Sequence, residues 1–393
     1  MGAEEVKKGI YWVGGKDWHI RNFHGYLTPL GTTYNAYLIV DEKVVLIDTV
    51  KEDLADEMLY RIGSIIDPSK IDYIICNHVE MDHSGSIPRV MELAPQATVF
   101  ASKRGEKAIN AHFQHNWDLK LMDTDDTLSI GSRTLSFINT PLVHWPDSMI
   151  TYSPDDKILF SNDAFGQHLA TAERYDDQVG WSSLRRDAAK YYANIVLPYG
   201  KQILKLAETL SKLEIEQICP SHGVIWRSFI PKIVEAYGKW ANHVTDKKAL
   251  LIYDTMWGST EKMVRMLERG LTEGGVPATV RHLKMNHITD LMTDVLESKL
   301  IAFGSPTLNN TFMPTMGGFI SYMKGLKPQN RTGFAFGSYG WGGQAVGEIE
   351  KILTELKWEI PTAGSKIEYV PTDADLSAVK ETGKILAEQL KVG

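Results

Sequence analysis

The last third of the chain alternates short apolar segments with amphipathic segments, and this regular pattern constrains its fold more than any other feature. Five strands are expected, each followed by a helix: Ala249–Tyr253, Ala278–Leu283, Leu300–Phe303, Thr332–Phe336 and Lys366–Val370. Strands that alternate with helices predict a doubly wound parallel sheet, and such sheets bind ligands at the carboxyl ends of their strands.

The first two thirds follow a different pattern, strand-rich at first and then mixed. Turn residues predict three hairpins, formed by Ala36–Val40 with Val44–Ile47, by the two arms of Thr127–Ile138, and by those of Met149–Phe160. Amphipathic stretches predict helices over Glu52–Ile66 and around Leu184–Leu213. The change of pattern near Lys247 predicts two α/β domains, residues 1–247 and 248–393.

Composition narrows the function classes. The 393 residues are 43 % hydrophobic and 23 % charged, with a net charge of -7, which argues against nucleic acid as a partner. No stretch approaches the ~20 apolar residues of a membrane span, and the N-terminus lacks the pattern of a secretory signal. The two cysteines, Cys76 and Cys219, offer neither a disulfide framework nor a cysteine-built metal site. We therefore expect a cytoplasmic protein without a membrane association.

The most informative segment follows the predicted strand Ile71–Cys76, where His78, Glu80, Asp82 and His83 place four potential metal ligands within six residues. Nitrogen and carboxylate donors without thiolate suit zinc, iron or manganese. Side chains that alternate along such a turn can address two neighbouring metals. The alternative for a lone histidine is a solvated turn or a helix cap, and the density of ligands here argues against it. His144, Asp163 and His222 each end a later predicted strand.

This order of ligands resembles the metallo-β-lactamase superfamily, whose first motif is usually His-x-His-x-Asp-His. Glu80 replaces the second histidine, and a carboxylate there makes a more anionic site that suits iron. His-x-Glu-x-Asp-His is the form found in flavodiiron proteins. The resemblance implies an αββα domain with two irons. One would bind His78, Glu80 and His144, the other Asp82, His83 and His222, and Asp163 would bridge them.

The second domain begins with a candidate phosphate loop. Thr255, Met256, Trp257, Gly258, Ser259 and Thr260 lie between the first strand and its helix, where backbone N–H groups and hydroxyls form an anion site. The loop resembles that of flavodoxins and implies FMN, although serine and threonine before a helix are most often simple caps. Two later loops support FMN: Ser305, Pro306, Thr307, Leu308, Asn309 and Asn310, and Ser338, Tyr339, Gly340, Trp341 and Gly342. Trp257, Tyr339 or Trp341 could stack on the flavin or simply pack.

From Trp18 to the last helix the chain resembles the flavodiiron proteins, or A-type flavoproteins, of the rubredoxin:oxygen oxidoreductase type. The family implies reduction of dioxygen to water, of nitric oxide to nitrous oxide, or both. It also implies a head-to-tail homodimer, with a dimer of dimers as a further option. His24 and Tyr192 match positions on the substrate side of the iron pocket in relatives, with ordinary packing as the alternative. Because the chain has no Cys-x-x-Cys pair, rubredoxin or a similar carrier would supply electrons.

Two rival functions remain open at this stage. The ligand order is shared with zinc hydrolases, so a zinc-dependent hydrolase with a flavodoxin-like appendage is one alternative. A non-catalytic electron carrier with a structural metal is the other. The sequence does not decide between dioxygen and nitric oxide as the substrate.

Overall fold

The computed structural model describes residues 2–392. The chain divides into two compact units, one of residues up to Tyr192 together with Lys201–Gly238, and the other of Ala193–Gly200 together with residues from Lys239 onward. The predicted domain boundary at Lys247 lies inside the first strand of the second unit, β17 (Asp246–Tyr253). None of the helices within residues 2–392 is long and apolar enough to cross a membrane.

The first unit is built on two sheets. The larger sheet has the order β1 (Glu4–Lys7), β2 (Ile10–Trp12), β7 (Tyr37–Val40), β8 (Val44–Ile47), β9 (Tyr73–Cys76), β10 (Thr98–Ser102), β11 (Leu119–Met122). The smaller has the order β12 (Thr127–Ser129), β13 (Thr134–Asn139), β14 (Met149–Ser153), β15 (Ile158–Asn162), β16 (Gln217–Pro220). The three predicted hairpins are confirmed, since β7 pairs antiparallel with β8, β12 with β13 and β14 with β15.

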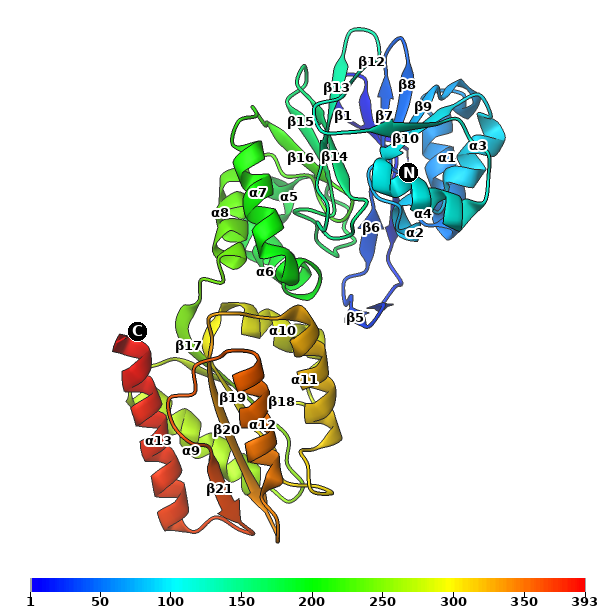
Figure 1. Cartoon of the computed structure of the whole chain (residues 1–393). Coiled ribbons are helices and arrows are strands. Elements are labelled where there is room, and N and C mark those ends of the chain that lie inside the picture. The colour runs from blue at the N-terminus through cyan, green and yellow to red at the C-terminus, as the bar shows by residue number, and fades with distance from the viewer. Residues whose placement is uncertain (1, 393) are drawn as a thin grey trace. The chain divides into compact units, whose positions relative to one another are not determined.

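Two short ribbons complete the strands of this unit, β3 (Gly15–Asp17) with β6 (Thr32–Tyr34) and β4 (Asn22–Phe23) with β5 (Tyr26–Leu27). Its helices are α1 (Ala55–Gly63), α2 (Met81–Ser84), α3 (Ile87–Leu93), α4 (Lys103–Phe113), α5 (Asp176–Val179), α6 (Trp181–Tyr191), α7 (Gly200–Leu210) and α8 (Ile230–Ala241). Helices α1, α3 and α4 cover one side of the pair of sheets, and α6, α7 and α8 lie on the other side (Figure 1). This arrangement confirms the αββα architecture.

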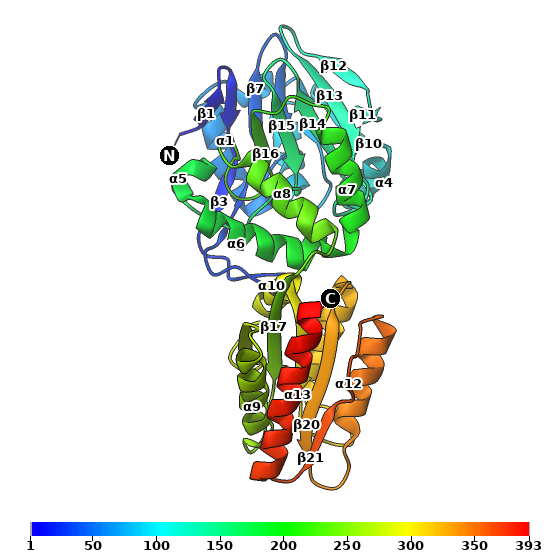
Figure 2. The ribbon, with the colours of Figure 1, turned by 90° about the vertical axis from the view of Figure 1, so that its left-hand side faces the viewer.

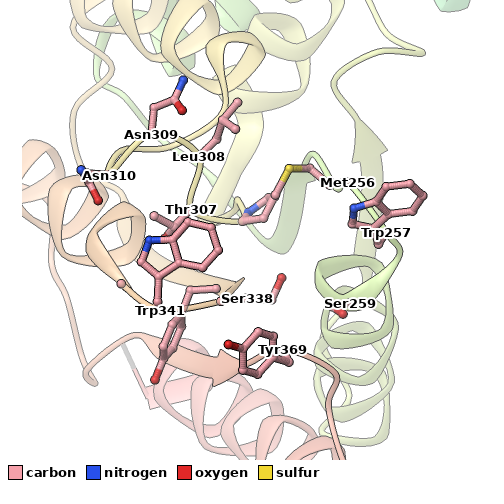
Figure 3. Close-up of a pocket in the computed structure, with 14 residues that line it drawn as sticks. Met256, Trp257, Ser259, Thr307, Leu308, Asn309, Asn310, Ser338, Trp341 and Tyr369 are labelled. Carbon is pink, nitrogen blue, oxygen red and sulfur yellow. The ribbon is translucent and has the colours of Figure 1, made fainter.

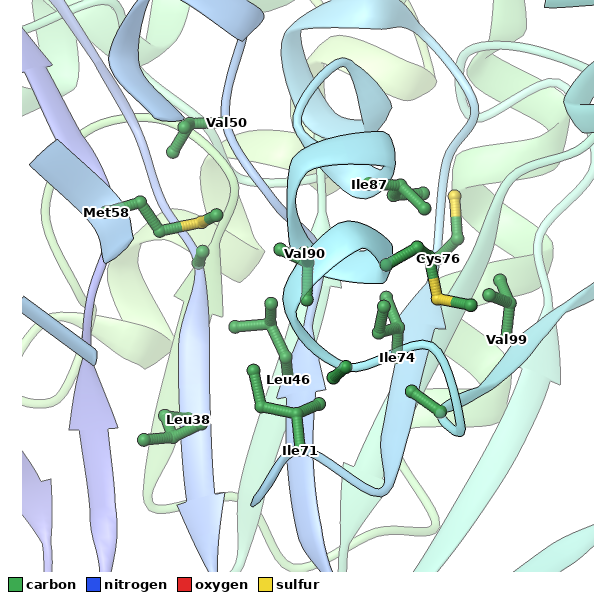
Figure 4. Packing of buried hydrophobic residues seen from close by; sticks show 14 of the residues in the cluster. Leu38, Leu46, Val50, Met58, Ile71, Ile74, Cys76, Ile87, Val90 and Val99 are labelled. Carbon is green, nitrogen blue, oxygen red and sulfur yellow. The ribbon is translucent and has the colours of Figure 1, made fainter. Parts of the chain in front are cut away.

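Two apolar clusters hold these layers together. Between the sheets, Trp12 and Phe100 of the larger sheet pack with Phe137 and Phe160 of the smaller one. Outside the larger sheet, strand residues such as Leu46 meet the helices that cover it (Figure 4). Every second side chain of a strand points to the same face, so the continuous apolar runs in β7, β8 and β9 fill both clusters.

The prediction of one continuous helix around Leu184–Leu213 is wrong. Helix α6 ends at Tyr191 and is followed by a π-helix (Tyr192–Val196), a 3-10 turn (Leu197–Tyr199) and then α7. Pro198 explains the break, because proline has no N–H to donate and its ring clashes with the preceding turn of an α-helix.

The second unit is the predicted doubly wound sheet. All five strands are parallel, in the order β18 (Ala278–His282), β17, β19 (Ser298–Gly304), β20 (Thr332–Tyr339), β21 (Ser365–Glu368). Helices α9 (Ser259–Glu273) and α13 (Asp373–Val392) lie side by side on one face, and α10 (Ile288–Glu297), α11 (Pro314–Leu326) and α12 (Gln344–Glu355) cover the other (Figures 1 and 2). Strand β21 ends at Glu368 and not at Val370 as predicted.

Candidate functional site

Seven predicted ligands meet beyond the ends of three strands of the first unit. His78, Glu80, Asp82 and His83 follow β9, with Glu80 at the N-cap of the short helix α2. His144 lies in the loop between β13 and β14, Asp163 directly follows β15, and His222 follows β16. Because β15 and β16 run parallel, their carboxyl ends reach the same edge of the sheet.

The first group of ligand atoms comprises His78, Glu80, His144 and one oxygen of Asp163. Glu80 Oε2 lies 3.3 Å from Nε2 of both His78 and His144. Asp163 Oδ2 lies 3.6 Å from His78 Nε2 and 3.4 Å from His144 Nε2. His78, His144 and Asp163 thus form a group that could hold a metal ion, and Glu80 lies next to both histidines.

The second group comprises Asp82, His83, His222 and the other oxygen of Asp163. Asp82 Oδ2 lies 3.3 Å from His83 Nε2 and 3.2 Å from His222 Nε2. Asp163 Oδ1 lies 3.3 Å from His83 Nε2 and 3.6 Å from His222 Nε2. Asp163 therefore presents one oxygen to each group, which is the arrangement that a bridging carboxylate requires.

Neighbouring groups orient these side chains from outside. Asp147 Oδ2 accepts hydrogen bonds from His78 Nδ1 at 2.9 Å and from the Val79 N–H at 2.8 Å. The Thr33 carbonyl accepts from His222 Nδ1 at 2.7 Å. Partners of this kind fix the ring and leave Nε2 to face a metal. Asp147 was not among the residues predicted from the sequence, although it follows His144 by three residues and so shares its loop.

The electrostatics of the first group show how strongly it attracts positive charge. Burial alone would lower the pKa of His78, but hydrogen bonds to Asp147 and Glu80 raise it to about 10. Burial opposes protonation of His144 as well, and Asp163 and Glu80 raise its pKa to about 10. Without a metal these imidazoles carry protons, and a cation must displace those protons to bind.

In the second group, too, neighbouring carboxylates raise the pKa of a buried histidine. Burial would lower the pKa of His83, but the Asp82 and Asp163 carboxylates raise it to about 9. Burial would raise the pKa of Asp163, yet His83 and His144 hold it well below its usual range. Carboxylates and imidazoles at this distance stabilise each other's charged forms, and a metal cation would take over that role.

The residues fit two divalent cations. Four buried atoms of the centre have no hydrogen-bond partner within the described chain, namely Asp82 Oδ1, both ring nitrogens of His83, and Asp163 Oδ2. Buried polar atoms without partners are rare in folded proteins and require an explanation. The carboxylates of Glu80, Asp82, Asp163 and Asp147 together carry four formal negative charges, which equal the charge of two divalent metals. Nitrogen and oxygen donors of this kind suit iron, zinc or manganese.

The two residues predicted on the substrate side lie in different surroundings. His24 is exposed on the β4–β5 hairpin with its ring centroid 4.7 Å from that of Phe23. Tyr192 is buried, and its ring packs edge-on against Tyr237 at 5.0 Å. The tyrosine that reaches the centre is Tyr191, whose hydroxyl donates to Asp163 Oδ1 at 2.9 Å. Sequence alone could not separate two adjacent tyrosines, because the register of α6 decides which one points inward.

The second unit has a cavity at the carboxyl edge of its sheet. The first loop runs from β17 into α9 through Gly258, whose φ of +85° favours glycine. The cavity has a volume of about 650 Å³, within the usual range for ligand sites. Met256, Trp257, Ser259, residues 306–310, residues 338–342 and Tyr369 line it (Figure 3). All three predicted loops therefore meet at one cavity.

Four predicted cofactor residues, Thr255, Gly258, Thr260 and Ser305, are not among the lining residues. The Thr255 hydroxyl accepts the Gly258 N–H at 3.0 Å, and the Thr260 hydroxyl is 3.0 Å from that of Ser338. Ser305 Oγ accepts the Met313 N–H at 2.9 Å. These hydroxyl groups make hydrogen bonds within the protein, and these bonds stabilise the conformation of the loops. Tyr369 also lines the cavity but was not predicted as a cofactor residue, because the sequence pattern placed it inside the last strand.

Four aromatic rings in this cavity fit a flat, partly apolar cofactor. Trp257, Tyr339, Trp341 and Tyr369 supply the rings, and the start of α9 supplies N–H groups for a phosphate. Fold and geometry together define a two-domain protein, in which an αββα domain carries a two-metal cluster and a flavodoxin-like domain carries the cavity.

Comparisons with known proteins agree with this description. The model of the ODP family beta lactamase matches residues 32–223, and the flavodoxin model matches residues 251–383. The chain is 43% identical to a nitric oxide reductase of Moorella thermoacetica, over 98% of both chains. The structure of rubredoxin oxygen:oxidoreductase from Desulfovibrio gigas superposes with a TM-score of 0.97 at 41% identity, over 99% of both chains. That of the flavodiiron protein from Giardia intestinalis gives a TM-score of 0.97 at 35% identity, over 100% of this chain and 97% of that one. The chain belongs to the flavodiiron protein family.

Proposed function

We propose that this protein is an oxidoreductase that reduces dioxygen to water, nitric oxide to nitrous oxide, or both, with FMN and two irons as cofactors. The observation that carries the proposal is Asp163, whose two oxygens face the two ligand groups separately. Relatives over the full length of the chain are named nitric oxide reductase and rubredoxin-oxygen oxidoreductase. These names favour a reductase over the zinc hydrolase and over the non-catalytic carrier.

Each iron would have its own protein ligands. His78, Glu80 and His144 would hold one, Asp82, His83 and His222 would hold the other, and Asp163 would bridge the pair. Glu80 distinguishes the site from a histidine-rich zinc site, because its carboxylate adds negative charge and stabilises the higher oxidation state of iron.

The residues around the ligands hold the centre in place. The Tyr191 hydroxyl donates to Asp163 Oδ1 and so limits rotation of the bridging carboxylate. Asp147 fixes the ring of His78, and the Thr33 carbonyl fixes that of His222. His24 and Tyr192 stay proposed as residues near the substrate.

FMN would lie in the cavity of the second unit, with its phosphate at the start of α9 and its ring among the lining aromatic side chains. When bound, FMN passes on electrons singly and a pair of irons stores two, which suits the reduction of a small oxidant. Ser259 is the hydroxyl residue of the first loop that lines the cavity, and its position at the first residue of α9 suits a phosphate.

Two partners follow from this proposal. A small electron carrier such as rubredoxin would deliver electrons to FMN. A second copy of the chain, arranged head to tail, would bring its irons to this flavin. In support, Trp257 and Trp341 beside the cavity are 94% and 91% exposed in the single chain, and large exposed aromatic groups often mark a contact surface. A cytoplasmic location is proposed as well, supported by two buried free cysteines.

The test is to load the full-length protein anaerobically with iron and FMN, reduce it, and mix it with dioxygen or nitric oxide in turn. Glu80→Ala should abolish consumption of both gases and leave FMN bound. Glu106→Ala changes an exposed glutamate of α4 outside the site and serves as the matched control. Equal gas consumption by zinc-loaded protein, or failure of the wild type to bind flavin, would contradict the proposal.

A further inference from the structure

Tyr369 is the residue that directly follows β21, and its backbone is unusual. Its φ angle is +53°, in the left-handed region that bulky side chains seldom occupy. A residue keeps such a conformation only where the surrounding structure enforces it, and these positions cluster at ligand sites.

The chain on both sides of Tyr369 is fixed. Its N–H donates to the Tyr339 carbonyl at 2.7 Å, which extends the pairing of β20 with β21 by one bond. Three residues later, Thr372 and Asp375 exchange hydrogen bonds at the start of α13, with Thr372 Oγ1 donating to the carboxylate at 2.6 Å. The short link between these two anchors determines where the ring of Tyr369 points.

The ring points into the cavity of the second unit. Tyr369 lines that cavity although 62% of its surface is exposed, and its side chain lies among the other lining residues (Figure 3). The ring lies next to Gly340 of the third loop, since a Cβ built at that position would be in ordinary van der Waals contact with Tyr369 Cε1, at 3.5 Å. Val370 shows that exposure alone does not place a side chain there, since it is 61% exposed and does not line the cavity.

We propose that Tyr369 is a further flavin-binding residue, contributed by the fifth strand, whose ring packs against the isoalloxazine of FMN. The inference rests on the proposed function, since it needs FMN in this cavity. It adds a contact from outside the three loops that the sequence predicted. The left-handed backbone places the ring at the cavity, and the isoalloxazine would cover the exposed ring.

The experiment measures FMN binding by the full-length apoprotein, from which flavin has been removed, in three variants. Tyr369→Asn removes the ring but tolerates the left-handed backbone. It should weaken FMN binding about three- to tenfold and reduce quenching of FMN fluorescence, because aromatic stacking is lost. Tyr369→Phe keeps the ring and should stay within about twofold of the wild type. Val370→Ala is the matched control for an exposed neighbour and should change neither quantity.

Wild-type affinity and quenching in Tyr369→Asn would overturn the inference and leave the proposed function intact. An equal loss in Tyr369→Phe would also overturn it, because the hydroxyl and not the ring would then bind. Absence of FMN binding by the wild type would instead contradict the proposed function. Far-UV circular dichroism and iron content check that each variant is folded.

Discussion

Asp147 should control the affinity of one metal position without being a ligand. It is 5% exposed, and its Oδ2 accepts from His78 Nδ1 and from the Val79 N–H. The change Asp147→Asn keeps the size of the side chain and removes its charge. His78 would keep its ring position only in part, because an amide oxygen is a weaker acceptor for the imidazole N–H than a carboxylate.

The magnitude follows from the number and type of bonds. One charge-assisted hydrogen bond to His78 is weakened in a buried site, which costs about 1.5–3 kcal/mol. Removal of such an orienting group typically lowers metal affinity by roughly 10–100-fold, or about 1.4–2.7 kcal/mol. The position held by His78, Glu80 and His144 should show the whole loss. The other position should change by less than about threefold, since the Thr33 carbonyl still orients His222.

The assay is anaerobic titration of the apoprotein with ferrous iron against a competing chelator, with Mössbauer spectra to distinguish the two positions. Asp156→Asn is the matched control. Asp156 is a buried carboxylate near the β14–β15 hairpin that accepts from Arg133 Nε at 2.9 Å and from Ser153 Oγ at 2.6 Å. This control should lower the free energy of unfolding but not the affinity for iron.

Two results would refute the reasoning about Asp147. Unchanged iron affinity at both positions would mean that the hydrogen bond to His78 does not orient the ligand. Equal weakening in Asp147→Asn and Asp156→Asn would mean that general destabilisation, and not the local bond, lowers the affinity.

Two further predictions concern pH. The pKa values of His78 and His83 are raised to about 10 and about 9, so iron must displace their protons in order to bind. The affinity for iron should therefore fall as the pH drops below about 9, and iron binding should release protons in weakly buffered solution. Iron binding that does not depend on pH would contradict this prediction. Burial raises the pKa of Asp187 from 3.8 to about 6, so the folded state binds the proton of this carboxyl group more tightly than the unfolded state does. The free energy of unfolding should therefore fall by at most ~3 kcal/mol as the pH rises from about 4 to about 6. Asp187→Asn should therefore raise the melting temperature at pH 8 and not at pH 4, and an equal change at both values would count against it.

The seven candidate ligands could be picked out from the sequence because they occupy a recurring local pattern. His78, Glu80, Asp82 and His83 follow a buried strand within one turn, and Asp163 and His222 follow two others. Where a strand ends can be read from apolar periodicity, and parallel strands bring their carboxyl ends to one edge. The resemblance to flavodiiron proteins implied that the seven residues would meet, and the structure brings them close together.

The residues that the sequence did not reveal depend on orientation. Tyr191 and Tyr192 are adjacent tyrosines, and only the direction in which α6 presents each ring selects the one that reaches Asp163. Tyr369 was expected within a strand, but its left-handed backbone ends β21 and turns the ring into the cavity. The contact between the hydroxyls of Thr260 and Ser338, which joins the first loop to the third, was also not foreseen from the sequence.

By itself the sequence determined the three hairpins of the first domain, the doubly wound sheet of the second and the three loops after its strands, because these follow from local spacing and composition. The αββα class and the set of candidate metal ligands came from the resemblance to a known family. Only the tertiary structure decided that Asp163 presents one oxygen to each ligand group, that Asp147 holds His78, and that Tyr369 lines the cavity. The physical reason is the distance along the chain over which each property is set. Periodicity is encoded within a few residues, whereas the direction of a side chain across a site depends on the packing of segments far apart in the chain.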